Sequence, residues 1–302
     1  MTYKAPRNLA GANGSPAVTA LLIEAALAVE NEDWLAAKAW FSRIYDSKHA
    51  TLEEIIFARF KHGACCENLN DYAAATADYD AILEIPEISD EQKAMALLSR
   101  GFSNAVSGEI NAAVADYTAV VKDPSTPRML VAAALLERAS VRIKSRDLNK
   151  AFADYKTVVA MDDLPDETMV EALTGRGSIR GVRRDMKGAI ADLTAAISLP
   201  DSGADQKAVA LLKRGVIYGE TGAMQKAIAD FSAILAMPDV PQKLRDIAKK
   251  YRRAASGDEP FEGCDTGGPP SSPDRINIRV DAVYSKNECC EDEYDEEEEE
   301  EG

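Results

Sequence analysis

The chain has 302 residues and is 46% hydrophobic, so it is long enough to bury a substantial core. Its aromatic content of 6%, together with recurring alanines, favours closely packed helices over a sandwich of strands. The net charge of −16 lies mostly in residues 256–302, which hold 17 acidic residues against three basic ones and leave residues 1–255 close to neutral. A near-neutral body excludes the basic surface of a nucleic-acid-binding protein, and five cysteines, three of them in or beside acidic stretches, outline no disulfide framework.

Residues 1–16 contain no apolar run of signal-peptide length, and no later segment reaches the roughly 18 consecutive apolar residues of a membrane span. We therefore expect a disordered N-terminus over 1–16 and a cytoplasmic protein with no membrane partner.

From residue 17 onward the sequence repeats with a period of 38, which is the step from Asp78 to Asp116 and again from Asp116 to Asp154. Two series of residues carry this period: the pairs Asp78-Tyr79, Asp116-Tyr117, Asp154-Tyr155, Asp192-Leu193 and Asp230-Phe231, and the arginines Arg100, Arg138, Arg176 and Arg214, each followed by Gly or Ala. The period predicts six repeats, at 17–54, 55–92, 93–130, 131–168, 169–206 and 207–244. Apolar residues at i, i+3, i+4 and i+7 predict two amphipathic helices in each, for example 94–106 and 111–122. Helix pairs this short must stack on their neighbours to bury their apolar faces.

The order of residues within each repeat resembles the tetratricopeptide repeat (TPR) family. A small residue is followed by Ala twelve positions later, an aromatic residue four after that and an apolar residue three further on, as in Gly101, Ala113, Tyr117 and Val120. The resemblance implies an all-α, right-handed superhelical solenoid of six TPR-like helix-turn-helix repeats. Two features depart from the family pattern: the period exceeds the usual value of about 34, and Leu97 and its equivalents replace a bulky aromatic residue.

The recurring small and aromatic residues are predicted to serve packing, because a missing side chain lets helices approach and an aromatic ring buries a large area. Each recurring Arg lies 16 positions before the recurring Asp, as in Arg100 and Asp116. We hypothesise a ladder of ion pairs along the repeats. The alternative is two independently solvated positions, whose pairing contributes only about 0 to 1 kcal/mol.

The resemblance implies a partner-binding groove lined by the first helices, at positions three before and one after the small residue. In this sequence the candidates are Phe60, Ala64, Leu98, Phe102, Leu136, Ser140, Thr174, Ser178, Leu212 and Val216. The absence of Lys and Asn from these positions argues against capture of a C-terminal carboxylate, and their apolar character suits a peptide or an amphipathic helix of another protein. The alternative is that these side chains fill the space between tightly packed helices.

The sequence offers no catalytic apparatus. His49 and His62 lie in different repeats, and His62 takes the position that Arg fills in later repeats, which favours a structural role. Neighbouring Cys65 and Cys66 fit helix packing, and no phosphate-binding loop or cysteine pair with zinc spacing is present. We therefore predict a protein that is not an enzyme, with no cofactor, no metal and no nucleic-acid partner.

After the repeats, residues 245–255 are predicted to form a capping helix, with Arg245, Lys249, Lys250, Arg252 and Arg253 on its outer side. Residues 256–302 are predicted to form a disordered acidic tail, with one possible strand over 276–283. The tail either keeps the protein in solution, binds a basic protein, or folds back on the basic residues of the cap. The sequence thus leaves two functions open: a protein-interaction scaffold, and an acidic-tail chaperone or nucleic-acid mimic.

Overall fold

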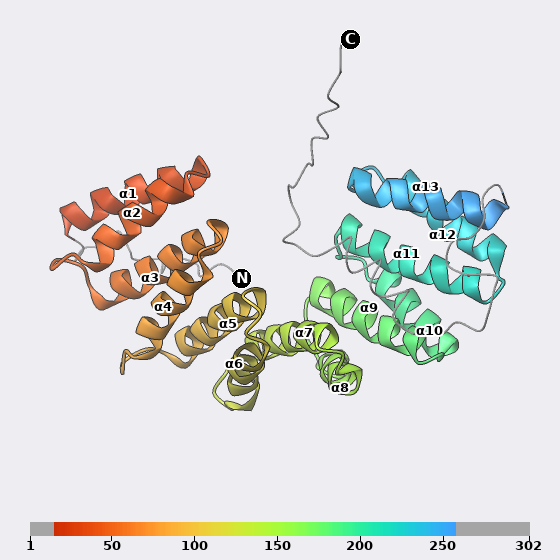
Figure 1. Cartoon of the computed structure of the whole chain (residues 1–302), viewed down its shortest axis with the longest axis horizontal. Helices are drawn as coiled ribbons and strands as arrows, with labels where there is room; N and C mark the ends of the chain where they lie inside the picture. Colours follow the sequence, from red (N-terminus) through yellow and green to blue (C-terminus); the bar gives the residue numbers. More distant parts are fainter. Residues whose placement is uncertain (1–14, 258–302) are drawn as a thin grey trace, which may run out of the picture. The chain divides into compact units, whose positions relative to one another are not determined.

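The computed structural model describes residues 15–257, which contain thirteen α-helices and no strand. The helices form pairs, as Figure 1 shows. The first helices of the pairs are α1 (Pro16–Glu30), α3 (Leu52–Asn68), α5 (Asp90–Val106), α7 (Arg128–Lys144), α9 (Asp166–Val182) and α11 (Ala204–Glu220). The second helices are α2 (Trp34–Tyr45), α4 (Tyr72–Leu83), α6 (Ile110–Lys122), α8 (Leu148–Val159), α10 (Met186–Ser198) and α12 (Met224–Ala236), and α13 (Gln242–Ser256) follows alone.

The helices divide into two compact units. The N-terminal unit ends at Leu164 and holds α1 to α8, and the C-terminal unit starts at Pro165 and holds α9 to α13. Within each unit, every helix packs against the helix that precedes it in the chain. Each unit is therefore a stack of helix pairs.

The helix boundaries follow the sequence period closely. From α3 to α13, each first helix begins one full period after the one before, and α13 begins where the first helix of a seventh pair would begin. The rows inferred from the sequence start slightly inside these helices, at 55, 93, 131, 169 and 207, because a periodic pattern fixes the length of a repeat but not its starting point.

The turn inside each helix pair has a fixed local structure. Its left-handed residue recurs once in every period, at Glu32, Asn70, Gly108, Arg146, Arg184 and Gly222. Glycine suits this position at 108 and 222, since a side chain is strained at positive φ. The next residue is the N-cap of the second helix, and in four pairs it is an Asp whose side chain accepts a hydrogen bond from the helix backbone: Asp33, Asp71, Asp147 and Asp185.

Close packing inside each pair depends on the small residue of the first helix. A Cβ atom built on Gly101 would lie 2.7 Å from the Tyr117 ring, and one on Gly215 would lie 2.6 Å from the Phe231 ring. Both rings are fully buried. The predicted packing role of the small and aromatic residues is confirmed, because the missing side chain is what admits the ring.

The first helices of each unit also contact one another. In the N-terminal unit α5 packs against α7, and in the C-terminal unit α11 packs against both α9 and α13. Among the described helices, no two second helices pack together to a comparable extent. At these places neighbouring helix pairs approach each other through their first helices, and we call the side of the first helices the inner side and that of the second helices the outer side.

The capping helix is longer than predicted, and one of its basic residues is placed differently. Arg245 does not lie on the outer side of α13, because its guanidinium group donates hydrogen bonds to the carbonyl oxygens of Leu235, Met237, Pro238 and Val240. These carbonyls belong to the end of α12 and the loop after it, where a cation is favoured by the helix dipole. Lys249, Lys250 and Arg253 are exposed, as predicted.

None of the helices in residues 15–257 combines the length and the apolar character that a membrane crossing requires. Of the two segments predicted to be disordered, 1–16 and 256–302, Pro16 belongs to α1 and Ser256 to α13. Residues 1–14 and 258–302, including the strand suggested at 276–283, lie outside the described residues.

Candidate functional site

The predicted Arg–Asp ladder is present and is bidentate in four repeats. In each rung the guanidinium group donates two hydrogen bonds to one carboxylate, at 2.5 to 3.1 Å. The rungs are Arg100–Asp116, Arg138–Asp154, Arg176–Asp192 and Arg214–Asp230. The four carboxylates are buried, so each needs a cation beside it, and the hypothesis of paired positions is confirmed over independent solvation.

The ladder also joins neighbouring helix pairs. Arg100 donates to Asp80, Arg138 to Thr118 and Arg214 to Thr194, in each case a residue 20 positions earlier on the preceding second helix. The acceptor is a carboxylate in one case and a hydroxyl in the other two, so no single residue type recurs at this position of the repeat. The ladder is a structural device, because its groups are committed to one another.

Most of the groove residues predicted from the resemblance are buried. Those are Phe60, Leu98, Leu136, Thr174, Leu212 and Val216, with 8% or less of each residue exposed. The other four, Ala64, Phe102, Ser140 and Ser178, are partly exposed. Leu98 lies in one apolar cluster with Leu130 and Val141 of α7, which shows that contact between first helices is what buries the position three before the small residue.

Among the accessible residues of the first helices from α3 to α11, one set recurs six and two positions before the small residue, and one and five positions after it. We call this set the first-helix face. In the N-terminal unit it consists of Lys61, Ala64 and Asn68 on α3, Met95, Ser99, Phe102 and Val106 on α5, and Ala133, Glu137, Ser140 and Lys144 on α7. On α9 and α11 of the C-terminal unit it consists of Glu171, Gly175, Ser178, Val182, Val209, Lys213 and Glu220.

The first-helix face is mixed rather than uniformly apolar. Its part on α5 is apolar, with Met95, Phe102 and Val106, and the neighbouring first helices contribute charges at Lys61 and Glu137. In the C-terminal unit the ammonium group of Lys213 donates to the Ser178 hydroxyl at 2.9 Å. A face with an apolar centre and charged borders matches a ligand that is itself amphipathic.

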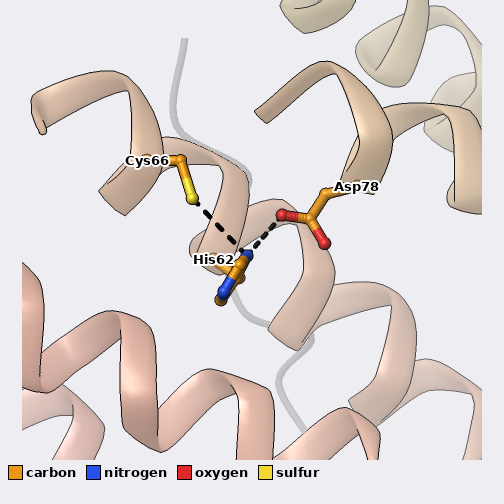
Figure 2. A group of neighbouring side chains, drawn as sticks. All are labelled: His62, Cys66 and Asp78. Atoms are coloured by element: carbon orange, nitrogen blue, oxygen red, sulfur yellow. Dashed lines mark hydrogen bonds and ion pairs between the residues drawn. The ribbon is translucent and has the colours of Figure 1, made fainter. Parts of the chain in front are cut away.

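A second candidate site lies in α3 and α4, where His62 replaces the ladder arginine. His62 Nδ1 forms a short hydrogen bond with Asp78 Oδ2, and Cys66 Sγ lies 3.7 Å from the same nitrogen. Figure 2 shows the three side chains converging from two turns of α3 and from α4. All three residues are buried, and both cysteines of this helix are free thiols.

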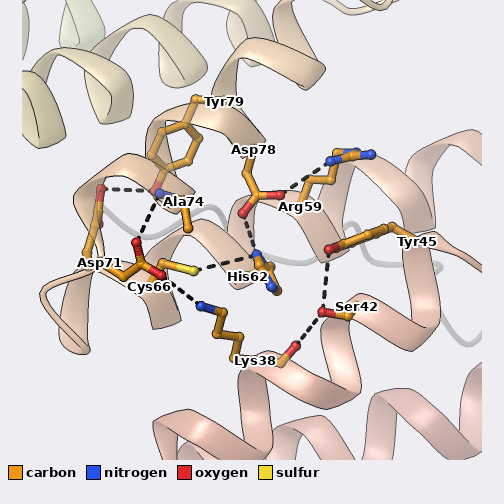
Figure 3. Close-up of polar contacts among 11 residues, drawn as sticks. Lys38, Ser42, Tyr45, Arg59, His62, Cys66, Asp71, Ala74, Asp78 and Tyr79 are labelled. Atoms are coloured by element: carbon orange, nitrogen blue, oxygen red, sulfur yellow. Dashed lines mark hydrogen bonds and ion pairs between the residues drawn. The ribbon is translucent and has the colours of Figure 1, made fainter.

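Charged and aromatic groups surround this cluster, as Figure 3 shows. Arg59 pairs with the other oxygen of Asp78, Oδ1, at 3.3 Å, and its guanidinium carbon lies 4.5 Å from the centre of the Tyr45 ring. On the opposite side, Lys38 donates to Asp71 at 3.0 Å. Tyr45 also packs edge-on against the His62 ring, with ring centres 5.4 Å apart.

The titration of these groups follows from their contacts. Burial alone lowers the pKa of His62, but its hydrogen bond to Asp78, with a smaller contribution from Cys66, raises the pKa to about 9. The pKa of Lys38 is raised mainly by its hydrogen bond to Asp71, and Cys66 adds to that effect. Burial raises the pKa of the neighbouring Cys65 thiol to about 12. Among the hydrogen bonds of the described residues, His62 contacts Cys66 and not Cys65.

No protein-family model and no curated protein sequence matches the chain. The structure is similar to the crystal structure of a tetratricopeptide repeat protein from Parabacteroides merdae ATCC 43184, with a TM-score of 0.60 and 14% sequence identity over 91% of this chain and 96% of that one. The TPR domain of P58(IPK) is 15% identical over 81% of this chain and 67% of that one, but its TM-score of 0.32 is too low to add to the argument. An all-helical chain whose paired helices keep one constant register, similar over nearly its whole length to a solved repeat protein, has the tetratricopeptide-repeat fold.

Proposed function

We propose that this chain is a non-enzymatic scaffold that binds a peptide or an amphipathic helix of another protein on its first-helix face. The observation that carries this proposal is the apolar band on α5, formed by Met95, Phe102 and Val106, which stays accessible while Leu97 and Leu98 of the same helix are buried. A ligand helix that places apolar side chains on this band meets Lys61 and Glu137 at its borders.

The same unit contains a matched pair of positions for a test. Phe102 lies on the first-helix face of α5, and Ala115 is exposed on α6, on the outer side of the same helix pair. We expect Phe102→Glu to abolish capture of the principal protein partner and Ala115→Glu to leave it unchanged, with both variants retaining the helical circular dichroism of the parent. Equal capture by both variants would contradict the proposed binding face.

The alternative function, a chaperone or nucleic-acid mimic that binds basic proteins, depends on the acidic run at 291–301. A chain that ends at Gly257 distinguishes the two functions, because a scaffold keeps its partner and an acidic mimic loses it. An acidic contact is also weakened when salt shortens the Debye length from about 10 Å at 0.1 M to about 3 Å at 1 M, whereas an apolar contact is not.

A cytoplasmic location is part of the same proposal. Its support is the pair of buried, free thiols at Cys65 and Cys66, which suit a reducing compartment. Labelling of intact and lysed cells with a membrane-impermeant reagent would test it.

A further inference from the structure

The cluster of His62, Cys66 and Asp78 stands at positions that hold ion pairs elsewhere in the array. In the fourth repeat Asp154 binds Arg138 and Arg142, and in the fifth Asp192 binds Arg176 and Arg180. In α3 the same two positions of the repeat, two periods before Arg138 and Arg142, hold His62 and Cys66. Relative to the fourth and fifth repeats, two cations are replaced by two side chains that can bind metal ions, while the carboxylate that they face is kept.

The three potential ligand atoms lie close enough to share one ion. His62 Nδ1, Cys66 Sγ and an Asp78 oxygen all lie within 4.8 Å of one another. Nitrogen, thiolate sulfur and carboxylate oxygen at about 2.0 to 2.3 Å from a zinc ion are separated by about 3 to 4 Å from one another in tetrahedral geometry. The Sγ to Nδ1 distance of 3.7 Å falls in that range, whereas Nδ1 and Asp78 Oδ2, which share a short hydrogen bond, have to move apart to admit the ion.

A single proton satisfies this arrangement poorly. One imidazole nitrogen faces both a carboxylate oxygen and a sulfur, and it can direct only one hydrogen, toward one of them. A cation placed between the three atoms accepts a lone pair from each. The two oxygens of Asp78 have different partners. Oδ1 pairs with Arg59, which fixes the orientation of the carboxylate, and Oδ2 faces His62, where it can bind the ion.

We propose that His62, Cys66 and Asp78 form a zinc site, with the imidazole nitrogen, the thiolate and one carboxylate oxygen as three of four tetrahedral ligands. Binding requires a neutral imidazole and a thiolate, so it releases protons. Arg59 is held by Asp78 Oδ1, which is not among the ligands, and Lys38 is held by Asp71, although its ammonium group also interacts with Cys66. The fourth position is open to water or to a donor from a bound partner.

Cobalt(II) is the probe for this site, because sulfur bound to tetrahedral cobalt gives charge-transfer and visible absorption bands that oxygen ligands do not give. The test uses the full chain with Cys264, Cys289 and Cys290 replaced by serine, so that Cys65 and Cys66 are the remaining thiols. Two further variants serve as comparisons. Cys65→Ser removes a buried thiol next to the site, and His62→Arg replaces a ligand with the residue that forms the ladder rung in other repeats.

We expect one equivalent of cobalt to produce the sulfur-dependent bands in the parent and in Cys65→Ser. Cys66→Ser should lose the bands, and His62→Arg should bind cobalt at least about 100-fold more weakly, since even residues outside the ligand shell change affinity by about 10- to 100-fold. Because His62→Arg restores an ordinary rung, it should fold even if Cys66→Ser does not. Bands that persist in either variant, or a parent with reduced thiols and no bands, would overturn the proposal.

Discussion

Tyr79 and Tyr117 occupy the same position in consecutive repeats, but their hydroxyl groups meet different surroundings. The Tyr79 hydroxyl donates to Glu67 Oε1 at 3.1 Å, and this oxygen also accepts from Ser103 at 2.8 Å. One repeat later Ala105 and Val141 stand in place of Glu67 and Ser103, and the Tyr117 hydroxyl is buried without a hydrogen-bond partner among the described residues. Burial raises the pKa of both phenols, so each keeps its proton at any ordinary pH.

Removing the two hydroxyls should therefore have opposite effects on stability. Tyr79→Phe loses a hydrogen bond to a carboxylate and should lower the free energy of unfolding by about 1 to 2 kcal/mol. Tyr117→Phe removes a buried polar group that has no partner, and it should leave the free energy of unfolding unchanged or raise it by up to about 1 kcal/mol.

Urea unfolding followed by circular dichroism gives the change for the whole chain, and hydrogen exchange of amides in α4 and α6 assigns it to the repeat concerned. Each variant serves as the control for the other, because both tyrosines occupy the same position on the second helix of their repeats. A loss for Tyr117→Phe as large as that for Tyr79→Phe would refute the reasoning.

Three further predictions concern other parts of the array. Asp154→Asn leaves the buried Arg138 and the half-buried Arg142 facing a neutral group and should lower the free energy of unfolding by about 3 to 5 kcal/mol. Lys150→Ala breaks an exposed ion pair and should cost less than about 1 kcal/mol, and urea midpoints compare the two variants. Gly101→Ala should lower stability by about 1 to 2 kcal/mol in the same assay, because contact with the Tyr117 ring costs about 1 to 3 kcal/mol and exceeds the gain of up to about 1 kcal/mol in helix propensity. Burial raises the pKa of Glu220, so its ionisation penalises the folded state, and stability falls as pH rises from the unfolded-state pKa through the higher folded-state pKa. Glu220→Gln should therefore stabilise the chain at about pH 7 and have little effect at about pH 4. Urea unfolding at the two pH values measures the difference.

The sequence predicted the features that every repeat shares. The regular spacing, the paired helices, the small residue beneath the ring and the Arg–Asp rungs each leave the same residue type at a fixed interval. Each is also local to one helix pair, so its geometry is set within a single repeat. This is why Arg100 and Asp116, 16 positions apart, could be paired from the sequence alone.

Features that depend on contact between repeats were harder to predict. Leu98 was expected to face a groove because its position does so in the family, but α5 and α7 pack closely enough to bury it. Arg245 was placed on the outer side of α13 by its charge, although the unpaired carbonyl groups at the end of α12 attract its guanidinium group inward. In both cases the position of the side chain is set by groups outside its own helix, which are apolar side chains for Leu98 and backbone carbonyls for Arg245. Neither kind of group leaves a distinctive residue type in the sequence.

In a repeat array, a residue that departs from the pattern can be compared with the residues at the same position of the other repeats. Arg to His at position 62 is by itself a conservative change of one cation for another, and this is how the sequence alone presents it. The structure adds that Cys66 stands on the next turn, in a position that holds arginine in the fourth and fifth repeats, and that both face the retained Asp78. A single substitution at a ladder position requires only that charge be balanced. With both substitutions, two metal-binding side chains face one carboxylate, and a divalent ion bound among the three gives them a common partner.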